Sequence, residues 1–290
     1  MPVKEDIALA YQSYYTHREN HQPPPDTWRH RLARKAGQGY LAFRYGYAER
    51  MHLPSRKWLG VLVFFNPGLR ADLDFSVFYL PVAPRQQLLE VGCGNGKMLK
   101  RMQELGWEVQ GIDIDPEAVV IAKDKGLKVI RGELSDQHFP EDHFDAVVMS
   151  HVIEHVLNPI DFMRECHRIL KSGGKLVLIT PNSKGWGHFL YAEAWFPLDP
   201  PRHVQIFSPS TLHSLAQEGD FTTRRVFTTV RNANGAFLAS WSIYRSGEYN
   251  MGSLQPWNRR LLARGMQFIE WLLLQVFPQA GEEVVMVAEK

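Results

Sequence analysis

The stretch LLEVGCGNG, from Leu88 to Gly96, constrains the fold of this chain more than any other segment. It is an apolar strand pattern that runs into a loop with glycine at positions 92, 94 and 96, and a helical pattern follows from Lys97. Glycine has no Cβ and tolerates positive φ, so such a loop lets the backbone approach a ligand closely. A strand, a glycine turn and a helix N-terminus together predict a site for a nucleotide-like ligand.

The spacing of these glycines separates two classes of ligand. A dinucleotide fingerprint G-x-G-x-x-G would need glycine at position 97, where the chain has Lys97. The spacing G-x-G-x-G after Glu90 instead resembles motif I of the class I S-adenosylmethionine (SAM) methyltransferases. A nicotinamide-dependent oxidoreductase is therefore disfavoured, and a glycine turn without a ligand is the structural alternative.

Short apolar segments alternate with helical patterns in the middle of the chain. They read QLLEV, EVQGIDI, KVIRGE, FDAVVMS and KLVLITP, as expected for parallel strands that are covered on both faces. Proline follows a capping residue at Asp115, Asn158 and Ser208, which predicts three helix starts, and Gly173–Gly174 is expected at a helix end. The pattern predicts a Rossmann-like, doubly wound α/β sheet.

The expected domain plan follows from where this alternation begins and ends. Residues 1–85 lack it and predict an N-terminal helical cap, whereas residues 86–230 predict the SAM-binding methyltransferase core. Residues 231–280 predict a helical insertion, and residues 281–290 the last strand of the core. Because the sheet of class I methyltransferases ends in an antiparallel pair, the resemblance implies an antiparallel last strand.

Composition restricts the partners and the compartment. The formal net charge of +2 gives no reason to expect a nucleic-acid partner. The two cysteines form no metal or disulfide pattern, and no signal peptide or membrane-spanning run is recognisable, so we expect a cytoplasmic protein. The oligomeric state is not indicated.

Several motifs in order extend the resemblance from Leu88 to Phe221. The segments FDAVVMSHVIEHVLNPIDFMRECHRILKSGGKLVLITPN and PPRHVQIFSPSTL resemble the type 23 SAM methyltransferases, which are similar to the ubiquinone-biosynthesis O-methyltransferases. The resemblance implies methyl transfer, with O-methylation of a small-molecule, glycan or lipid-like acceptor as the expected reaction. The alternative from a different class is a non-catalytic partner protein that binds SAM.

The same resemblance assigns positions to the cofactor. Asp113, at the end of the second strand, is expected to accept hydrogen bonds from the two ribose hydroxyls, as acidic residues do in dinucleotide folds. Glu133 and Leu134 are expected at the adenine, and Ser150 near the methionine end. The expected SAM-binding residues are Glu90, Gly92, Cys93, Gly94, Gly96, Asp113, Ile114, Glu133, Leu134 and Ser150.

The segment from His151 to His155, HVIEH, concentrates chemically active side chains. Taken alone, H-x-x-E-H matches an inverted zinc-peptidase motif, which needs a helix through the motif and a third ligand. Quinone and small-RNA 2′-O-methyltransferases carry E-x-x-E-H here and can hold a divalent metal, with a further histidine near His203. Because His151 replaces their first glutamate, we assign no metal ligands. A metal site, a general base and a structural role stay open, as does a metal-assisted quinone-type or RNA-terminal enzyme.

A general base suits a hydroxyl acceptor, because the SAM sulfonium is already a good leaving group. A neutral histidine has a pKa near neutrality, as a base in this position requires. We expect His151 to be the first choice, since the end of its strand faces the methyl group in this fold. His203 is the second choice, and His155 completes the expected catalytic set.

One helical segment carries a membrane-like pattern. Arg259, Arg260 and Arg264 accompany a wide apolar stripe that continues to Phe277. Such helices lie in membrane interfaces, but they also cover sheet edges or dimer contacts. Peripheral contact with the inner membrane face is therefore one expectation, and the apolar run Trp58–Phe65 adds to the case for a lipid-like acceptor.

Overall fold

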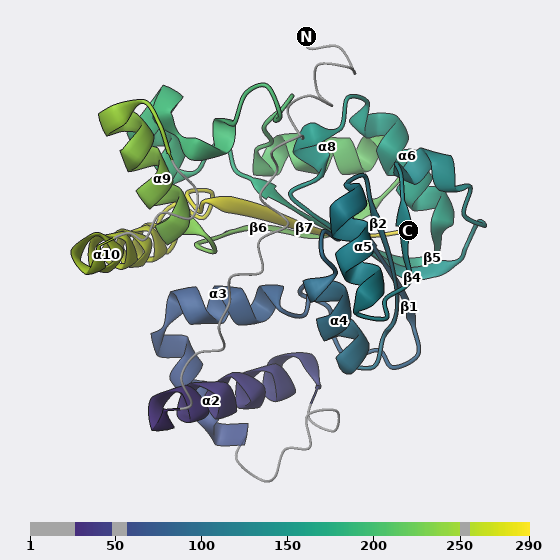
Figure 1. Ribbon diagram of the computed structural model, residues 1–290, viewed down its shortest axis with the longest axis horizontal. Helices are drawn as coiled ribbons and strands as arrows, with labels where there is room; N and C mark the ends of the chain where they lie inside the picture. The colour runs from purple at the N-terminus through teal and green to yellow at the C-terminus, as the bar shows by residue number, and fades with distance from the viewer. Residues whose placement is uncertain (1–26, 48–56, 250–255) are drawn as a thin grey trace. The chain divides into compact units, whose positions relative to one another are not determined.

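The computed structural model describes residues 27–47, 57–249 and 256–290 (Figure 1). Residues 1–26 and 48–56, which belong to the expected N-terminal cap, lie outside the described residues. The chain divides into two compact units, which we call the N-terminal unit and the C-terminal unit, and the division falls between Glu133 and Leu134. Each unit is built from its own local signals and holds its own set of candidate functional residues.

The N-terminal unit begins with helices and continues into parallel strands. Tyr40 and Tyr45 of its first described helix both donate hydrogen bonds to Asp74 Oδ1, which ties that helix to α3. In the strand part, β1 pairs in parallel with β2, and β2 pairs in parallel with β3. The elements are α2 (Trp28–Tyr45), η2 (Lys57–Phe65), α3 (Pro67–Phe75), β1 (Gln87–Val91), α4 (Lys97–Glu104), β2 (Glu108–Asp113), α5 (Pro116–Asp124) and β3 (Val129–Arg131).

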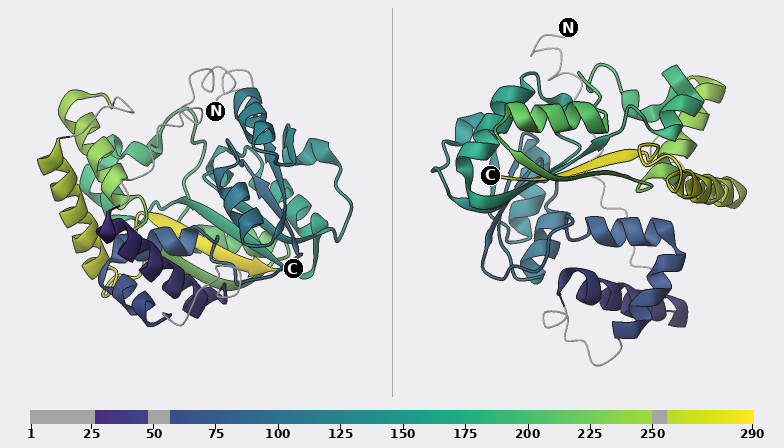
Figure 2. Two further views of the ribbon diagram at one scale, coloured as in Figure 1. Left: turned by 60° about the horizontal axis from the view of Figure 1, so that its bottom comes forward. Right: turned by 180° about the vertical axis from the view of Figure 1, so that it is seen from behind.

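The C-terminal unit combines parallel and antiparallel pairing. Strand β4 pairs in parallel with β5, whereas β7 pairs antiparallel with both β5 and β6 (Figure 2). Its elements are η3 (Leu134–Gln137), β4 (Phe144–Ser150), η4 (Ile153–His155), α6 (Pro159–Ile169), β5 (Leu170–Pro181), α7 (Trp186–Tyr191), η5 (Ala192–Ala194), η6 (Phe196–Leu198), α8 (Pro209–Glu218), β6 (Thr222–Thr229), α9 (Ala233–Ser246), α10 (Trp257–Leu273) and β7 (Glu283–Glu289).

In the N-terminal unit the strand order is β3-β2-β1, and in the C-terminal unit it is β4-β5-β7-β6. The central strands are buried along most of their length, which explains their continuous apolar sequences. The predicted Rossmann-like α/β fold with an antiparallel last strand is therefore confirmed.

The three predicted helix starts are confirmed. Asp115, Asn158 and Ser208 are the N-caps of α5, α6 and α8, and each side chain accepts a hydrogen bond from a backbone N–H of the first turn. The expected helix end at Gly173–Gly174 is wrong. Helix α6 ends at Ile169, and the glycines lie inside β5, where Gly173 has φ +75°. The pairing of β5 with β4 is interrupted after Leu170 and resumes at Lys175, so four residues of β5 have no partner in that register.

Two segments expose large apolar side chains. In η2 of the N-terminal unit, Trp58, Val61 and Phe65 are exposed, and in the C-terminal unit α10 exposes a second set. In the described ranges, no helix is both long and apolar enough to cross a membrane.

Candidate functional site

The glycine loop after β1 has the backbone that its sequence predicts. Gly92, Gly94 and Gly96 have φ values of +71°, +52° and +74°, a region that side chains with a Cβ rarely adopt. A Cβ on Gly96 would lie 2.4 Å from Leu127 Cδ1 and 3.0 Å from Ala122 Cβ. This glycine therefore lets the start of α4 pack closely against α5 and the loop that follows it. A Cβ on Gly94 would meet no atom within 4 Å, so the loop keeps an open face at this residue.

Asp113 stands beside this open face. Its Oδ2 accepts a hydrogen bond from Gly94 N at 2.6 Å, and its Oδ1 accepts one from Asp115 N at 2.9 Å. Burial raises the pKa of Asp113, while the backbone hydrogen bonds lower it. Each carboxylate oxygen has a second lone pair, so the group can still accept hydrogen bonds from a ligand diol.

Glu90 supplies a further polar group at the end of β1. It is buried, and its Oε2 has no hydrogen-bond partner among the described residues. Burial raises the pKa of Glu90 well above its usual range, and the nearby Asp113 carboxylate adds to the effect. A buried oxygen without a partner is costly, and a hydrogen-bond donor on a ligand removes that cost.

The remaining predicted cofactor residues lie at the strand ends. Ile114 follows Asp113 and is 48% exposed, an open apolar surface of the kind that a nucleoside base or sugar covers. Cys93 is buried in the loop, and burial raises the pKa of its thiol. Glu133 is exposed at the end of the N-terminal unit, whereas Leu134 is buried and Ser150 half-buried in the C-terminal unit. Their contacts with a cofactor stay a prediction.

A nucleoside with a charged end fits the residues of the N-terminal unit. The open face at Gly94 admits a ligand close to the backbone, and the orphaned Glu90 oxygen and Asp113 offer acceptors for N–H or O–H groups. The amino-terminal end of α4 contributes backbone N–H groups that have no partner inside the helix. The loop therefore fits the ribose and the amino-acid end of SAM.

A second set of polar residues lies in the C-terminal unit, directly after β4. His151 has φ +56°, a strained conformation for a residue with a Cβ. Its Nε2 lies 2.9 Å from Glu283 Oε1, and its Nδ1 lies 3.3 Å from Glu154 Oε1. Burial lowers the pKa of His151, but the two carboxylates outweigh burial and raise it to about 9. His151 is therefore protonated at neutral pH and links two carboxylates.

Glu283, the first residue of β7, is the centre of this network. The side chains of Arg231 and Asn232 also donate to it, with Arg231 Nη1 at 2.7 and 2.9 Å from its two oxygens. Burial raises the pKa of Glu283, but Arg231 and His151 outweigh this and hold the pKa below its usual range. The buried carboxylate is thus ionised and held by two cations.

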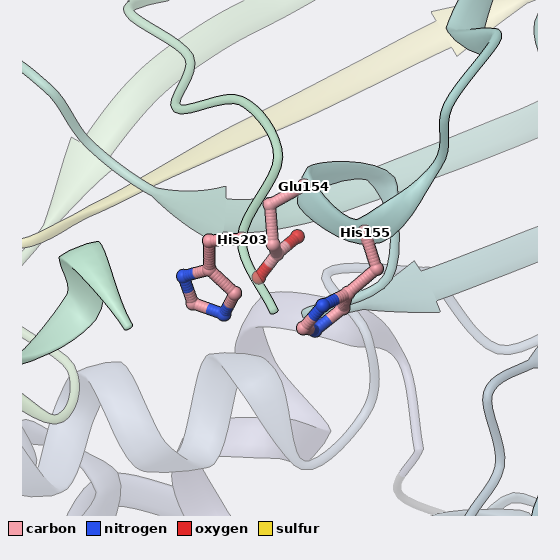
Figure 3. A group of neighbouring side chains, drawn as sticks. All are labelled: Glu154, His155 and His203. Atoms are coloured by element: carbon pink, nitrogen blue, oxygen red, sulfur yellow. The ribbon is translucent and has the colours of Figure 1, made fainter. Parts of the chain in front are cut away.

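Three further side chains of this region converge on one another (Figure 3). Glu154, His155 and His203 each offer one ligand atom, and these atoms all lie within 4.8 Å of one another. Nδ1 of His155 lies 3.0 Å from Arg202 O, and Nδ1 of His203 lies 2.5 Å from Pro197 O. A carbonyl oxygen can only accept, so each ring carries a proton on Nδ1.

The cluster faces a cavity of about 370 Å³. Apolar and aromatic side chains make up much of the wall, and His151, His155 and His203 supply polar groups, as is usual in small-molecule sites. The other lining residues are Pro181, Phe196, Pro197, Asp199, Asn232, Gly235, Ala236, Ala239, Tyr249, Glu282 and Glu283.

The sequence reasoning placed the histidines correctly in one neighbourhood but missed their partners. Glu283 and Arg231 lie far along the chain, and the antiparallel register of β7 with β5 and β6 brings them to the end of β4. The available signal was the pair Glu282–Glu283 at the start of an otherwise apolar strand, since buried acids need partners. In the structure His151 lies between Glu154 and Glu283, whereas Glu154, His155 and His203 bring their ligand atoms together.

Comparison with known proteins defines the class. The methyltransferase domain family, type 23, matches residues 20–226, well over half of the chain. The chain therefore belongs to this family of SAM-dependent methyltransferases, and SAM is the cofactor of its class, as the sequence predicted.

Individual relatives agree with this assignment. The chain is 30% identical over 151 residues to a ubiquinone biosynthesis O-methyltransferase of Maricaulis maris, which is 48% of this chain and 59% of the relative. It is 29% identical over 199 residues to a probable SAM-dependent methyltransferase of Mycolicibacterium smegmatis, covering 65% and 74% of the two chains. The chain thus spans less than two thirds of the first of these relatives.

A solved structure agrees on the fold. Phosphoethanolamine N-methyltransferase 2 of Haemonchus contortus, in complex with SAM, superimposes with a TM-score of 0.54 at 17% identity, over 76% of this chain and 52% of the other. At this level of identity the likeness concerns the fold alone.

Proposed function

We propose that this chain transfers the methyl group of SAM to a hydroxyl oxygen of a small-molecule, glycan or lipid-like acceptor bound in the 370 Å³ cavity. The observation that carries the proposal is the position of His203 at the cavity wall, where Pro197 O holds the Nδ1 proton and the lone pair of the neutral ring is therefore on Nε2. Burial lowers the pKa of His203, so the ring is neutral near pH 7 and can accept a proton.

The protein has two tasks in this reaction, which are to position the acceptor and to take its proton. SAM supplies a methyl group on a positively charged sulfur that is ready to leave. The acceptor oxygen forms a bond to the methyl carbon while the carbon–sulfur bond breaks, which yields a methyl ether and S-adenosylhomocysteine. His203 takes the hydroxyl proton at Nε2 and later releases it to water. Holding the hydroxyl in line with the methyl group supplies much of the acceleration.

This assignment moves the proton acceptor from His151 to His203. A base must have a free lone pair, and both ring nitrogens of His151 face carboxylates. We propose that His151 instead fixes the position of Glu154, whose second oxygen accepts from Thr180 Oγ1 at 2.9 Å. Glu154 in turn lies close to the ring nitrogens of His155 and His203.

The cavity wall favours an acceptor with an aromatic or isoprenoid portion. Phe196 and Tyr249 meet edge to face with ring centres 5.6 Å apart, and Ala236 and Ala239 add small apolar groups. Such walls bind flat apolar rings through dispersion and aromatic contacts. The name of the Maricaulis maris relative, a ubiquinone biosynthesis O-methyltransferase, points to the same acceptor chemistry.

A second candidate is the metal-assisted form of the same reaction. Glu154, His155 and His203 would be the ligands, and the carbonyl groups that hold both Nδ1 protons are the usual outer partners of metal-bound histidines. One carboxylate and two imidazoles suit manganese, iron or zinc better than magnesium. A cation there would bind the acceptor oxygen and lower its pKa.

Methyl-labelled SAM tests the proposal. The protein is incubated with a prenylated catechol, with the same compound already methylated on both hydroxyls, and with a sugar, and S-adenosylhomocysteine and labelled product are measured. We expect label only in acceptors with a free hydroxyl. SAM binding in calorimetry without turnover on any hydroxyl would refute the proposal and favour the non-catalytic alternative. The cytoplasmic location expected from the sequence stays a prediction.

A further inference from the structure

Helix α10 has one face that is anchored to the C-terminal unit. Ala263 and Glu270 are buried, and Gln267 lies between them on the same side of the helix. Gln267 Nε2 donates to Val230 O at 2.9 Å, and Glu270 Oε1 accepts from Glu282 N at 2.7 Å. The helix also packs against α9, and the two helices lie side by side in Figures 1 and 2. Its orientation about its own axis is therefore fixed.

The opposite face of α10 is apolar and exposed. Trp257, Leu261, Phe268 and Leu272 are spaced so that, at 100° per residue, they form a single stripe along the helix. All four are exposed, with Trp257 at 78% and Leu261 at 62%. A helix on the surface of a globular protein normally turns polar residues outward, so this stripe indicates an interaction surface.

The charged residues of α10 that border the stripe are basic. Arg259, Arg260 and Arg264 are the basic residues of α10, and all three are exposed. At 100° per residue Arg260 and Arg264 lie beside the stripe, whereas Arg259 lies on the other side of the helix, with its guanidinium 5.2 Å from the centre of the Trp241 ring. Its single acidic residue, Glu270, is buried on the anchored face. The exposed surface of α10 therefore combines apolar side chains with positive charge.

We propose that α10 docks on the surface of an anionic lipid bilayer, with its apolar stripe in the boundary between headgroups and acyl chains. Arg260 and Arg264 would lie at the level of the lipid phosphates, where a basic amphipathic helix gains both apolar burial and attraction to anionic lipid. A second copy of this chain is a poorer partner, since a symmetric contact through the same face would bring arginines against arginines. This inference is independent of the acceptor and of the proposed base.

Sedimentation with vesicles tests the proposal on the full chain, without SAM or acceptor. Vesicles of phosphatidylcholine alone are compared with vesicles in which roughly a quarter of the lipid is phosphatidylglycerol, since anionic lipid is what the arginines would recognise. The stripe variant is Leu261→Glu/Phe268→Glu. The matched control is Val120→Glu, which places the same charge at an exposed apolar residue of α5.

We expect the wild type and Val120→Glu to bind the anionic vesicles equally, and the stripe variant to bind about tenfold more weakly or not at all. Arg264→Glu should weaken binding to the anionic vesicles by about tenfold and leave the weak binding to neutral vesicles unchanged. Circular dichroism and thermal unfolding show whether each variant is folded.

Three results would overturn the proposal. The first is absence of wild-type binding to anionic vesicles, and the second is equal binding by the wild type and the folded stripe variant. The third is a stripe variant that changes only self-association in sedimentation velocity, because this would assign the face to contact between copies of the chain.

Discussion

Two glycines of one loop should fail in different ways when each is replaced by alanine. Gly94 and Gly96 both have positive φ, so alanine strains the backbone at either position. Their surroundings differ. The new Cβ at position 94 would enter open space, whereas the Cβ at position 96 would lie 2.4 Å from Leu127 Cδ1 and 3.0 Å from Ala122 Cβ. Ala122 cannot rotate away, because its Cβ is fixed to the backbone of α5.

The magnitudes follow from these contacts. The left-handed conformation costs an alanine about 1–2 kcal/mol, and Gly94→Ala has no further steric cost in the protein. Gly96→Ala adds overpacking of about 1–3 kcal/mol, because both Leu127 and Ala122 are buried. We therefore expect about 2–5 kcal/mol of destabilisation for Gly96→Ala and at most about 2 kcal/mol for Gly94→Ala. SAM affinity should fall more in Gly94→Ala than in Gly96→Ala, since the open face at Gly94 is where the ligand would lie.

Thermal unfolding and calorimetry with S-adenosylhomocysteine separate the two effects. We expect Gly94→Ala to remain folded and to lose roughly tenfold or more in affinity, as a steric contact with the ligand of about 1.4 kcal/mol would cause. Gly96→Ala should unfold at a clearly lower temperature. If folded Gly94→Ala binds S-adenosylhomocysteine as the wild type does, the loop is not the cofactor site.

Three further outcomes test the C-terminal unit. His203→Ala should lower the rate of methyl transfer at least about a hundredfold and leave SAM affinity unchanged, and unaltered turnover would remove it as the base. His151 has a folded pKa of about 9 against about 6.5 unfolded, so its stabilisation is complete below pH 6.5 and is lost as the pH rises through 9. Because its side chain is 34% exposed, we expect about 1–2 kcal/mol, measured as a melting-temperature difference from His151→Gln that disappears by about pH 10. If the metal-assisted form operates, manganese should raise the melting temperature of the wild type but not of Glu154→Gln, and equal shifts would exclude this ligand set.

The local parts of the fold were predictable because their signals are local. A capping residue followed by proline sets a helix start whatever the rest of the chain does, and all three such sites are confirmed. The glycine loop is equally local, since positive φ depends on the residue itself. The predicted helix end at Gly173–Gly174 was wrong because glycine is not specific to helix ends. Glycines also occur in irregular strands, and here the pairing of β5 with its neighbours determines the structure.

The partners of the histidines could not be predicted because they depend on pairing over a long range. Nothing near His151 in the sequence indicates that it faces Glu283, which becomes its neighbour only when β7 returns antiparallel to β5. The sequence also could not tell a free histidine from one whose nitrogens are both engaged. That distinction decides which residue can accept a proton, and it moved our choice of base to His203.

The charges around His151 bear on the sequence expectation that a metal-binding methyltransferase would carry glutamate at this position. Glu154 and Glu283 are buried anions, and His151 and Arg231 are the cations that face them. The network is therefore close to neutral. A glutamate at position 151 would place three carboxylates together and would need a cation to balance them. His151 supplies that positive charge from the chain itself, so any metal at Glu154, His155 and His203 would gain less electrostatic attraction than it would beside a glutamate. On this reasoning the substitution shifts the site away from dependence on metal and toward proton transfer by a neutral histidine.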